Sequence, residues 1–150
     1  MAKSRRHRQR GGSALEMAFL LPWYIFLFVG AFDWGFYAHA LISTESAARV
    51  AAIATSASNS TAADSTLACT YALEELRIVS NIGSTTTCSG TPVTVTATKL
   101  CSSGCTSNSA DGNPASQVAV TYTTQSLIPI PMLLAKQATF YRVVQMRLRS

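Results

Sequence analysis

The sequence predicts an α+β protein: a long N-terminal helix, then a second short helix and a small antiparallel sheet of about three strands. Apolar residues run almost without interruption from Ser13 to Phe32 and continue at helical spacing to about Ser56–Ser60. Three later segments are rich in β-branched and aromatic residues, as strands are. They are VTVTATKL, which alternates with period two, QVAVTYTTQSL and ATFYRVVQMRLR.

The first half of the long helix has the length and composition of a membrane span. About 20 apolar residues rise about 30 Å, which is the thickness of a bilayer core. Overall 48% of the residues are hydrophobic and 13% are charged, whereas soluble domains carry about 25% charged residues. We therefore expect a transmembrane segment over residues 13–34 within a helix over 12–60. The Asp33 side chain is expected in water, at the outer end of this span.

The distribution of basic residues predicts on which side of the membrane each end of this span lies. Of the 12 basic residues, five precede Gly11, and the remaining 12 − 5 = 7 face 7 acidic residues. Because Lys and Arg are retained on the cytoplasmic side, residues 1–11 are expected in the cytoplasm and residues 61–150 outside it, as a small α+β domain. A nucleic-acid-binding arm is the competing interpretation of KSRRHRQR, but nothing downstream supports it, and we expect no nucleic-acid partner.

Within the outer domain, the helix is expected over Ser65–Val79. Asp64 or Ser65 can cap its N-terminus, and the residues of LACTYALEELRIV are spaced for one buried face. The stretches NIGSTTTCSGTP and CSSGCTSNSADGNPAS are expected as loops because they contain Gly, Asn-Pro and Asp-Gly punctuation.

Four cysteines follow the apolar run, at Cys69, Cys88, Cys101 and Cys105. Outside the cytoplasm disulfides are the expected state. Zinc is the alternative, but it usually needs two short Cys or Cys/His knuckles, and the sequence has one close cysteine pair and no nearby histidine. Of the three possible pairings, closeness along the chain favours Cys69–Cys88 with Cys101–Cys105.

The sequence offers no catalytic constellation. Its two histidines, His7 and His39, have no partner with evident chemistry, and there is no Gly-rich phosphate loop, His/Glu metal cluster or nucleophile elbow. We expect no enzymatic activity, no cofactor and no metal.

The N-terminal layout resembles that of prepilins: a basic leader, a glycine, a gap, a glutamate and a long apolar helix. More narrowly, RRHRQRGGSALEMAFLLP, GAFDWGFYAHAL and ESAARVAA resemble the TadE-like minor pilins (pseudopilins) of the Tad/Flp pilus and secretion apparatus. Met17 departs from the aromatic residue that usually follows the glutamate. The resemblance covers the first third of the chain well and the remainder only by layout.

The resemblance implies cleavage by a prepilin peptidase after a glycine. Cleavage between Gly11 and Gly12 makes Glu16 the fifth residue of the mature chain, although the second glycine leaves the cut ambiguous by one residue. It also implies assembly with other pilins and with inner-membrane Tad proteins, in or on the bacterial inner membrane. The implied role is to join, or to prime, a pilus used for adhesion or surface attachment.

Glu16 and Pro22 are the candidate assembly residues. A carboxylate in a membrane span is unfavourable by a few kcal/mol, but the new α-amine of a neighbouring subunit can pair with Glu16 and set the axial register. The alternative is a side chain that reaches the cytoplasmic headgroups, where the helix dipole also favours an acid. Pro22 removes one backbone donor and is expected to kink the helix.

Two other classes of protein remain open. One is a secreted protein with an ordinary signal peptide, for which Ala38–Ala40 is a passable cleavage motif, although the apolar stretch is too long for an h-region. The other is a bitopic scaffold subunit with an uncleaved anchor. The N-terminus of the mature chain distinguishes all three.

Overall fold

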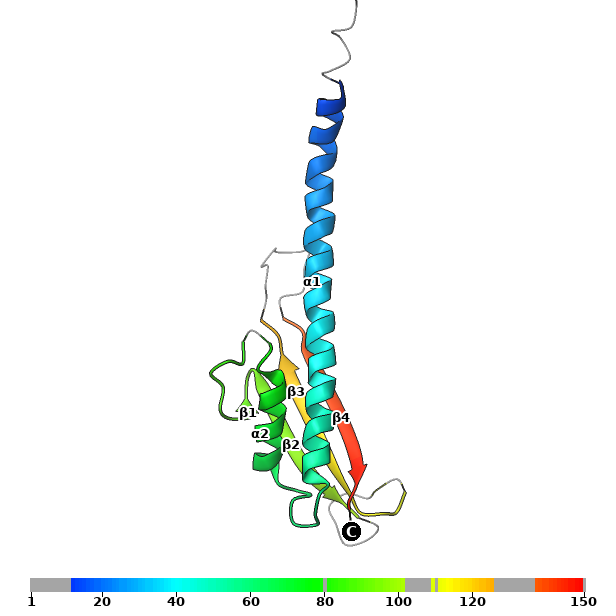
Figure 1. The fold of residues 1–150 in the computed structure, drawn as a ribbon, viewed down its shortest axis with the longest axis vertical. Coiled ribbons are helices and arrows are strands. Elements are labelled where there is room, and N and C mark those ends of the chain that lie inside the picture. The colour runs from blue at the N-terminus through cyan, green and yellow to red at the C-terminus, as the bar shows by residue number, and fades with distance from the viewer. Residues whose placement is uncertain (1–11, 80, 102–108, 110, 126–136, 150) are drawn as a thin grey trace, which may run out of the picture. The chain divides into compact units, whose positions relative to one another are not determined.

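The computed structural model describes residues 12–79, 81–101, 109, 111–125 and 137–149, with side chains from residue 14 onward. The elements follow one another as α1 (Gly12–Thr55), α2 (Ser65–Leu76), β1 (Ser89–Gly90), β2 (Val93–Leu100), β3 (Ala115–Thr123) and β4 (Thr139–Arg147) (Figure 1). The predicted α+β class is confirmed. The chain divides into an N-terminal unit, residues 1–36, and a C-terminal unit, residues 37–150.

In the N-terminal unit, α1 is long and apolar enough to cross a membrane, with a mean hydropathy of 1.8 and none of its most apolar window buried. The side chains from Ala14 to Phe28 are exposed on every face of the helix. Phe19 is 79% exposed and Phe28 is 74% exposed. A helix that is apolar all round needs either protein or lipid around it.

In the C-terminal unit, α1 changes character and buries one face made of small residues. Its fully buried alanines are Ala40, Ala47, Ala48, Ala51 and Ala52, which recur at the spacing of one helix face. These alanines join the same hydrophobic core as residues of α2 and of the sheet. Side chains this short let a helix backbone approach its neighbours closely.

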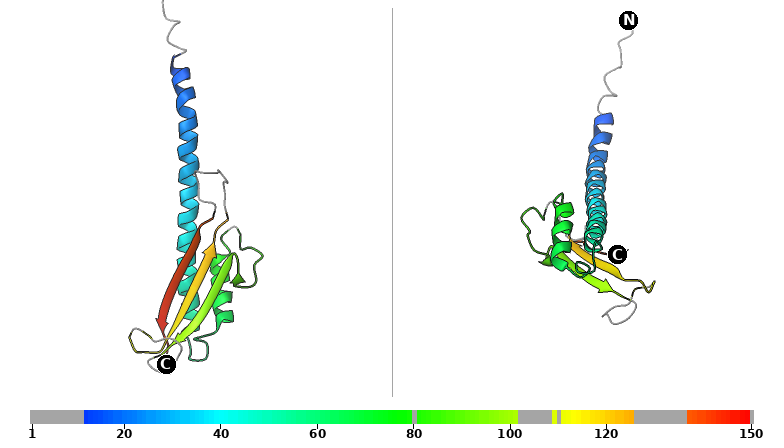
Figure 2. Two further views of the ribbon diagram at one scale, coloured as in Figure 1. Left: turned by 180° about the vertical axis from the view of Figure 1, so that it is seen from behind. Right: turned by 60° about the horizontal axis from the view of Figure 1, so that its bottom comes forward.

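The sheet is antiparallel throughout, in the order β1-β2-β3-β4. The two helices lie on the same face of it (Figure 2). That face carries buried residues at alternate positions of β2 and β3, namely Val93, Val95, Ala97, Val118, Val120 and Tyr122. The register places Val120 opposite both Val95 and Arg142, so the inward-facing row continues into β4.

Several bounds differ from the sequence prediction: α1 ends at Thr55 instead of near residue 60, and β3 begins at Ala115, within a predicted loop. The sheet has a fourth strand, because Ser89–Gly90 pairs with the start of β2, and two residues are too few to show an alternating pattern. The second helix ends at Leu76, three residues before the predicted Val79. The backbone N–H of Val79 donates to the Leu76 carbonyl at 2.9 Å, which is the i to i−3 pattern of a tight final turn.

Side chains fix the start of α2 and its position on the sheet. The Asp64 carboxylate accepts from the backbone N–H groups of Thr66 and Leu67 at 2.9 and 3.0 Å, which is the expected N-cap. The Ser65 hydroxyl accepts from the Ala97 N–H of β2 at 3.1 Å. A disulfide, Cys69–Cys88, joins α2 to the segment before β1.

A second group of polar side chains connects the end of α1 to the sheet. The Ser116 hydroxyl, fully buried, lies 2.8 Å from Thr55 Oγ1 and 2.9 Å from the Ala62 carbonyl oxygen. The Thr55 hydroxyl also bonds back to the Ala51 carbonyl of its own helix at 3.0 Å. The buried hydroxyls of Thr55 and Ser116 thus have hydrogen-bond partners at the point where α1 ends and the connection to α2 begins.

Candidate functional site

Glu16 lies one turn into α1, with an exposed side chain between exposed apolar neighbours. Leu15, Met17 and Leu20 are 63%, 65% and 48% exposed. Gly11, on the predicted leader side of the cut, lies outside the described residues, and α1 begins at Gly12. Within the described part of the chain, no hydrogen bond or ion pair reaches the Glu16 carboxylate. Any partner that neutralises it must come from outside these residues.

Pro22 lies inside α1, which continues through it as one helix to Thr55. A proline at this position cannot donate to the carbonyl four residues earlier, that of Ala18. Glu16 and Pro22 therefore lie six residues apart on one helix, and the predicted kink stays a prediction.

Asp33 does not have the environment expected of it. Its residue is only 4% exposed, whereas the neighbouring Phe32 and Trp34 are 60% and 77% exposed. The expectation that the side chain lies in water was wrong. Helical spacing from the apolar run gave no signal of this burial.

The cysteines are oxidised wherever the structure describes them. Cys69 and Cys88 have the expected pairing, with a Cα–Cα distance of 5.7 Å. Cys101 is also disulfide-bonded, but Cys105 lies outside the described residues, so the pairing of these two stays a prediction. Among the residues with described positions, no group of three or more His, Cys, Asp or Glu side chains is placed to hold a metal ion.

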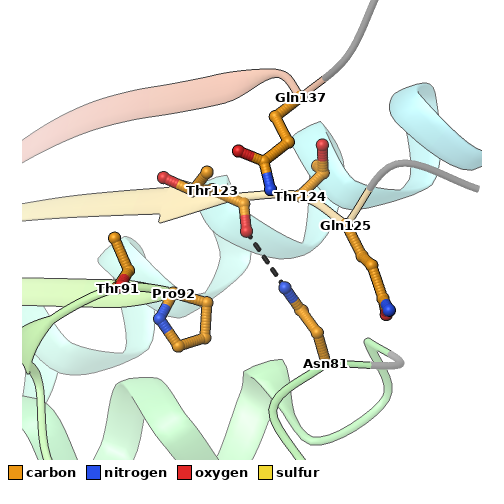
Figure 3. A pocket seen from close by; sticks show the side chains of 7 residues that line it. All are labelled: Asn81, Thr91, Pro92, Thr123, Thr124, Gln125 and Gln137. Carbon is orange, nitrogen blue, oxygen red and sulfur yellow. Dashed lines mark hydrogen bonds between the residues drawn. The ribbon is translucent and has the colours of Figure 1, made fainter. Parts of the chain in front are cut away.

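A polar pocket of about 350 Å³ opens where β3 ends (Figure 3). Its described lining carries amides, hydroxyls and one proline, but no charged side chain; the residues are Asn81, Thr91, Pro92, Thr123, Thr124, Gln125 and Gln137. The Asn81 amide donates to the Thr123 carbonyl at 3.1 Å. These groups can hydrogen-bond a neutral polar molecule, but they supply no acid–base pair for catalysis.

The side-chain amide oxygen of Asn81 (Oδ1) accepts a hydrogen bond from the hydroxyl of Tyr122, which is fully buried. Burial disfavours the phenolate and raises the pKa of Tyr122 to about 12, while the hydrogen bond to Asn81 opposes this shift. Tyr122 therefore orients Asn81 between the core and the pocket. Its chemistry is that of a neutral hydrogen-bond donor.

A second hollow, here called the α1–β4 groove, lies between α1 and the edge strand. It measures about 580 Å³ and is lined by Glu45 and Arg49 of α1 and by residues 142–146 of β4. Glu45 and Arg49 form an ion pair one helical turn apart. Arg142 occupies an inward position of β4, and its Nε atom is buried without a hydrogen-bond partner.

Sequence reasoning did not identify Arg142 as a functional residue. The signal was available in the strand pattern, because period-two alternation puts Arg142 on the same face as Phe140 and Val144. Both of these apolar neighbours pack against the core. Arg142 is therefore a charged residue among the otherwise apolar inward-facing residues of β4, and this departure from the pattern points to the groove.

The comparison with protein families gives a match to the N-terminal part of the chain. Residues 11–52 match the family model described as TadE-like protein. This range includes the start of α1, Glu16, Pro22 and all five fully buried alanines of α1. No curated protein and no solved structure matches the chain. The resemblance stated from the glutamate and the long helix is thus confirmed as a similarity to the TadE-like protein family over residues 11–52.

Proposed function

We propose that the protein is a minor pilin or pseudopilin of a Tad-type pilus, which assembles with other pilins through its N-terminal helix. The observation that carries the proposal is the TadE-like match over residues 11–52. This match includes the whole part of α1 that leaves large apolar side chains exposed, and it extends into the half with buried alanines. A helix of this kind is complete only when lipid or other helices surround it.

The topology follows from charge and from the cysteines. The five basic residues before Gly11 hold the leader in the cytoplasm. Residues 13–34 then span the inner membrane and deliver residues 61–150 to the outside. The Cys69–Cys88 disulfide is stable in an oxidising compartment of that kind. Inner-membrane Tad proteins and the lipid bilayer are the expected surroundings.

In this proposal a prepilin peptidase removes the leader between Gly11 and Gly12. The cut exposes a positive α-amine at the membrane face, four residues before Glu16. The Glu16 carboxylate of one subunit then pairs with the α-amine of its neighbour. Each charge is unfavourable in lipid when alone and tolerable when paired, so the pairing fixes the axial register of adjacent subunits.

The mass of the membrane-extracted chain tests the proposal. A chain that begins at Gly12 is expected. Gly11→Ala should leave the precursor uncut, whereas the control Gly30→Ala should be processed normally, because a Cβ at Gly30 meets nothing within 4 Å. A chain beginning at Leu41 contradicts the pilin proposal and supports a signal peptide. A chain beginning at Met1 or Ala2 supports an uncleaved anchor instead.

A further inference from the structure

We propose that the C-terminal units of this protein associate head to tail, with one face of α2 in one copy docked into the α1–β4 groove of a second copy. The contact pairs the Glu74 carboxylate of the first copy with the Arg142 guanidinium of the second. This proposal deepens the proposed assembly role and rests on it only for bringing the copies together in one membrane.

The groove offers a cation without a counter-charge. The carboxylate of Glu45 is already engaged by Arg49, which leaves one net positive charge on Arg142. Arg142 makes no hydrogen bond or ion pair with any described residue, and its buried Nε is unsatisfied. Burial of such a donor is unfavourable until an acceptor reaches it. Val144 and Met146, partly buried beside it, make the rest of the surface apolar.

The surface that fits this groove, here called the stripe, is formed by Tyr71 and Glu74 of α2 and by Ile78 just after its end. Tyr71 is 40% exposed and Ile78 is 75% exposed, and Glu74 between them is exposed. Tyr71 and Glu74 are three residues apart on one side of α2, and Ile78 follows in the turn after the last helical residue, Leu76. The opposite side is buried, at Ala68, Ala72, Leu73 and Leu76. The stripe thus presents one carboxylate between two apolar side chains.

Glu74 is also the acidic side chain that remains free among the described residues of the C-terminal unit. Asp64 caps α2, Glu45 pairs with Arg49, and Asp111 pairs with Arg147 at 2.9 Å. Glu75 accepts from the Ser46 hydroxyl at 3.3 Å. In the described residues, no hydrogen bond or ion pair engages Glu74. Groove and stripe therefore carry complementary unpaired charges, each flanked by apolar side chains.

The two surfaces lie on different sides of α1, so a single copy cannot join them. Figure 1 shows α2 on one side of the C-terminal part of α1 and β4 on the other. The sheet order separates β2, over which α2 packs, from β4 by one strand. A contact between unlike surfaces is heterologous and can be repeated from copy to copy. It needs no twofold axis, which suits subunits added one after another.

Zero-length crosslinking of the full-length processed protein tests the pairing. Arg142→Lys keeps the cation and adds an amine, which a carbodiimide joins to a carboxylate in direct contact. Heavy-isotope-labelled and unlabelled chains are mixed in lipid vesicles and the crosslinked peptides are mapped. The expected product joins Glu74 of one chain to Lys at position 142 of another. As a control, Arg147→Lys, on the outward face of the same strand, should crosslink to Asp111 within one chain.

Charge reversal provides the second readout. Glu74→Arg and Arg142→Glu should each reduce the self-association of labelled chains in vesicles by about tenfold or more, as expected for one partner of a desolvated charge pair. The double variant should restore it. An intact Cys69–Cys88 bridge in each variant shows that the unit still folds.

Three results overturn this proposal: no crosslink between heavy and light chains, single reversals without effect, or crosslinks from position 142 only to carboxylates other than Glu74. In each case processing at Gly12 still reports separately on the proposed function.

Discussion

The two halves of α1 differ in the size and in the burial of their side chains, although they belong to one continuous helix. From Ala14 to Phe28 the helix carries large apolar side chains and exposes them on every face. From Ala40 to Thr55 it carries alanines and threonines on one face and buries that face completely. The first half is incomplete in a single chain, whereas the second finds its partners within the chain. Helix length and hydropathy therefore do not show which part of a helix acts between molecules.

The difference lies in the size of the side chains as well as in their polarity. Burial of a Phe or Leu side chain in lipid or protein contributes a large favourable free energy, because each removes a large apolar surface from water. Burial of an alanine side chain contributes little free energy by itself, but its small size lets the backbone of α1 lie close to α2 and the sheet. If this comparison is correct, substitutions in the two halves should have separable effects on stability and assembly.

The largest expected effect on stability comes from the disulfide, which supports the half that is complete within the chain. Cys69→Ser with Cys88→Ser should lower the free energy of unfolding of the C-terminal unit by about 3 kcal/mol, because the bridge closes a 19-residue separation. Denaturant unfolding of the detergent-solubilised full chain measures this. Helicity of the apolar half should not change. Equal stability with and without the bridge contradicts the prediction.

An overpacked alanine comes next. Ala51→Leu should destabilise the C-terminal unit by about 1–3 kcal/mol, because Ala51 is fully buried in the core and a larger side chain overpacks such a site. The matched change in the apolar half, Ala14→Leu, concerns an exposed residue and should leave that unfolding transition unchanged. A shift of the same size from both variants shows that the halves do not differ as described.

The smallest expected effect concerns Tyr122. Its folded-state pKa of about 12 exceeds the ordinary value of 10. The associated stability is therefore fully present below about pH 10 and is lost as the pH rises toward 12. Tyr122→Phe should remove this dependence and lower stability at neutral pH by about 1 kcal/mol, through the lost hydrogen bond to Asn81. Unfolding curves at several alkaline pH values, compared between the two proteins, measure both effects.

Most of the fold could be predicted from the sequence, because the residues of its helices and strands follow strong periodic patterns. The alternation of VTVTATKL predicted the bounds of β2, Val93–Leu100, without error. The long apolar run predicted α1, and Asp64 was one of two expected caps for α2. Strand β1 was missed because two residues carry no period, and its pairing depends on its place beside β2.

The candidate sites were harder to predict from the sequence, because each depends on residues that are far apart along the chain and close together in the fold. Glu16 was identified by its position between a leader and an apolar helix. The α1–β4 groove joins residues nearly a hundred positions apart, and only the folded sheet brings Arg142 beside α1. The burial of Asp33 was likewise not predicted, since helical periodicity carries no information beyond the helix itself.

The role of Glu16 is the most direct test of a helix that is completed only between molecules. Glu16→Gln, and more severely Glu16→Leu, should give a processed, membrane-resident protein whose C-terminal unit and Cys69–Cys88 bridge are intact. This protein should no longer crosslink to partner pilins and should support few or no pili, because the neighbouring α-amine loses its counter-charge. The measurement is the number of pili per cell at matched levels of processed protein. Wild-type numbers from Glu16→Leu contradict the assembly role and leave Glu16 as a headgroup-facing residue; accumulation of uncut precursor assigns it to peptidase recognition instead.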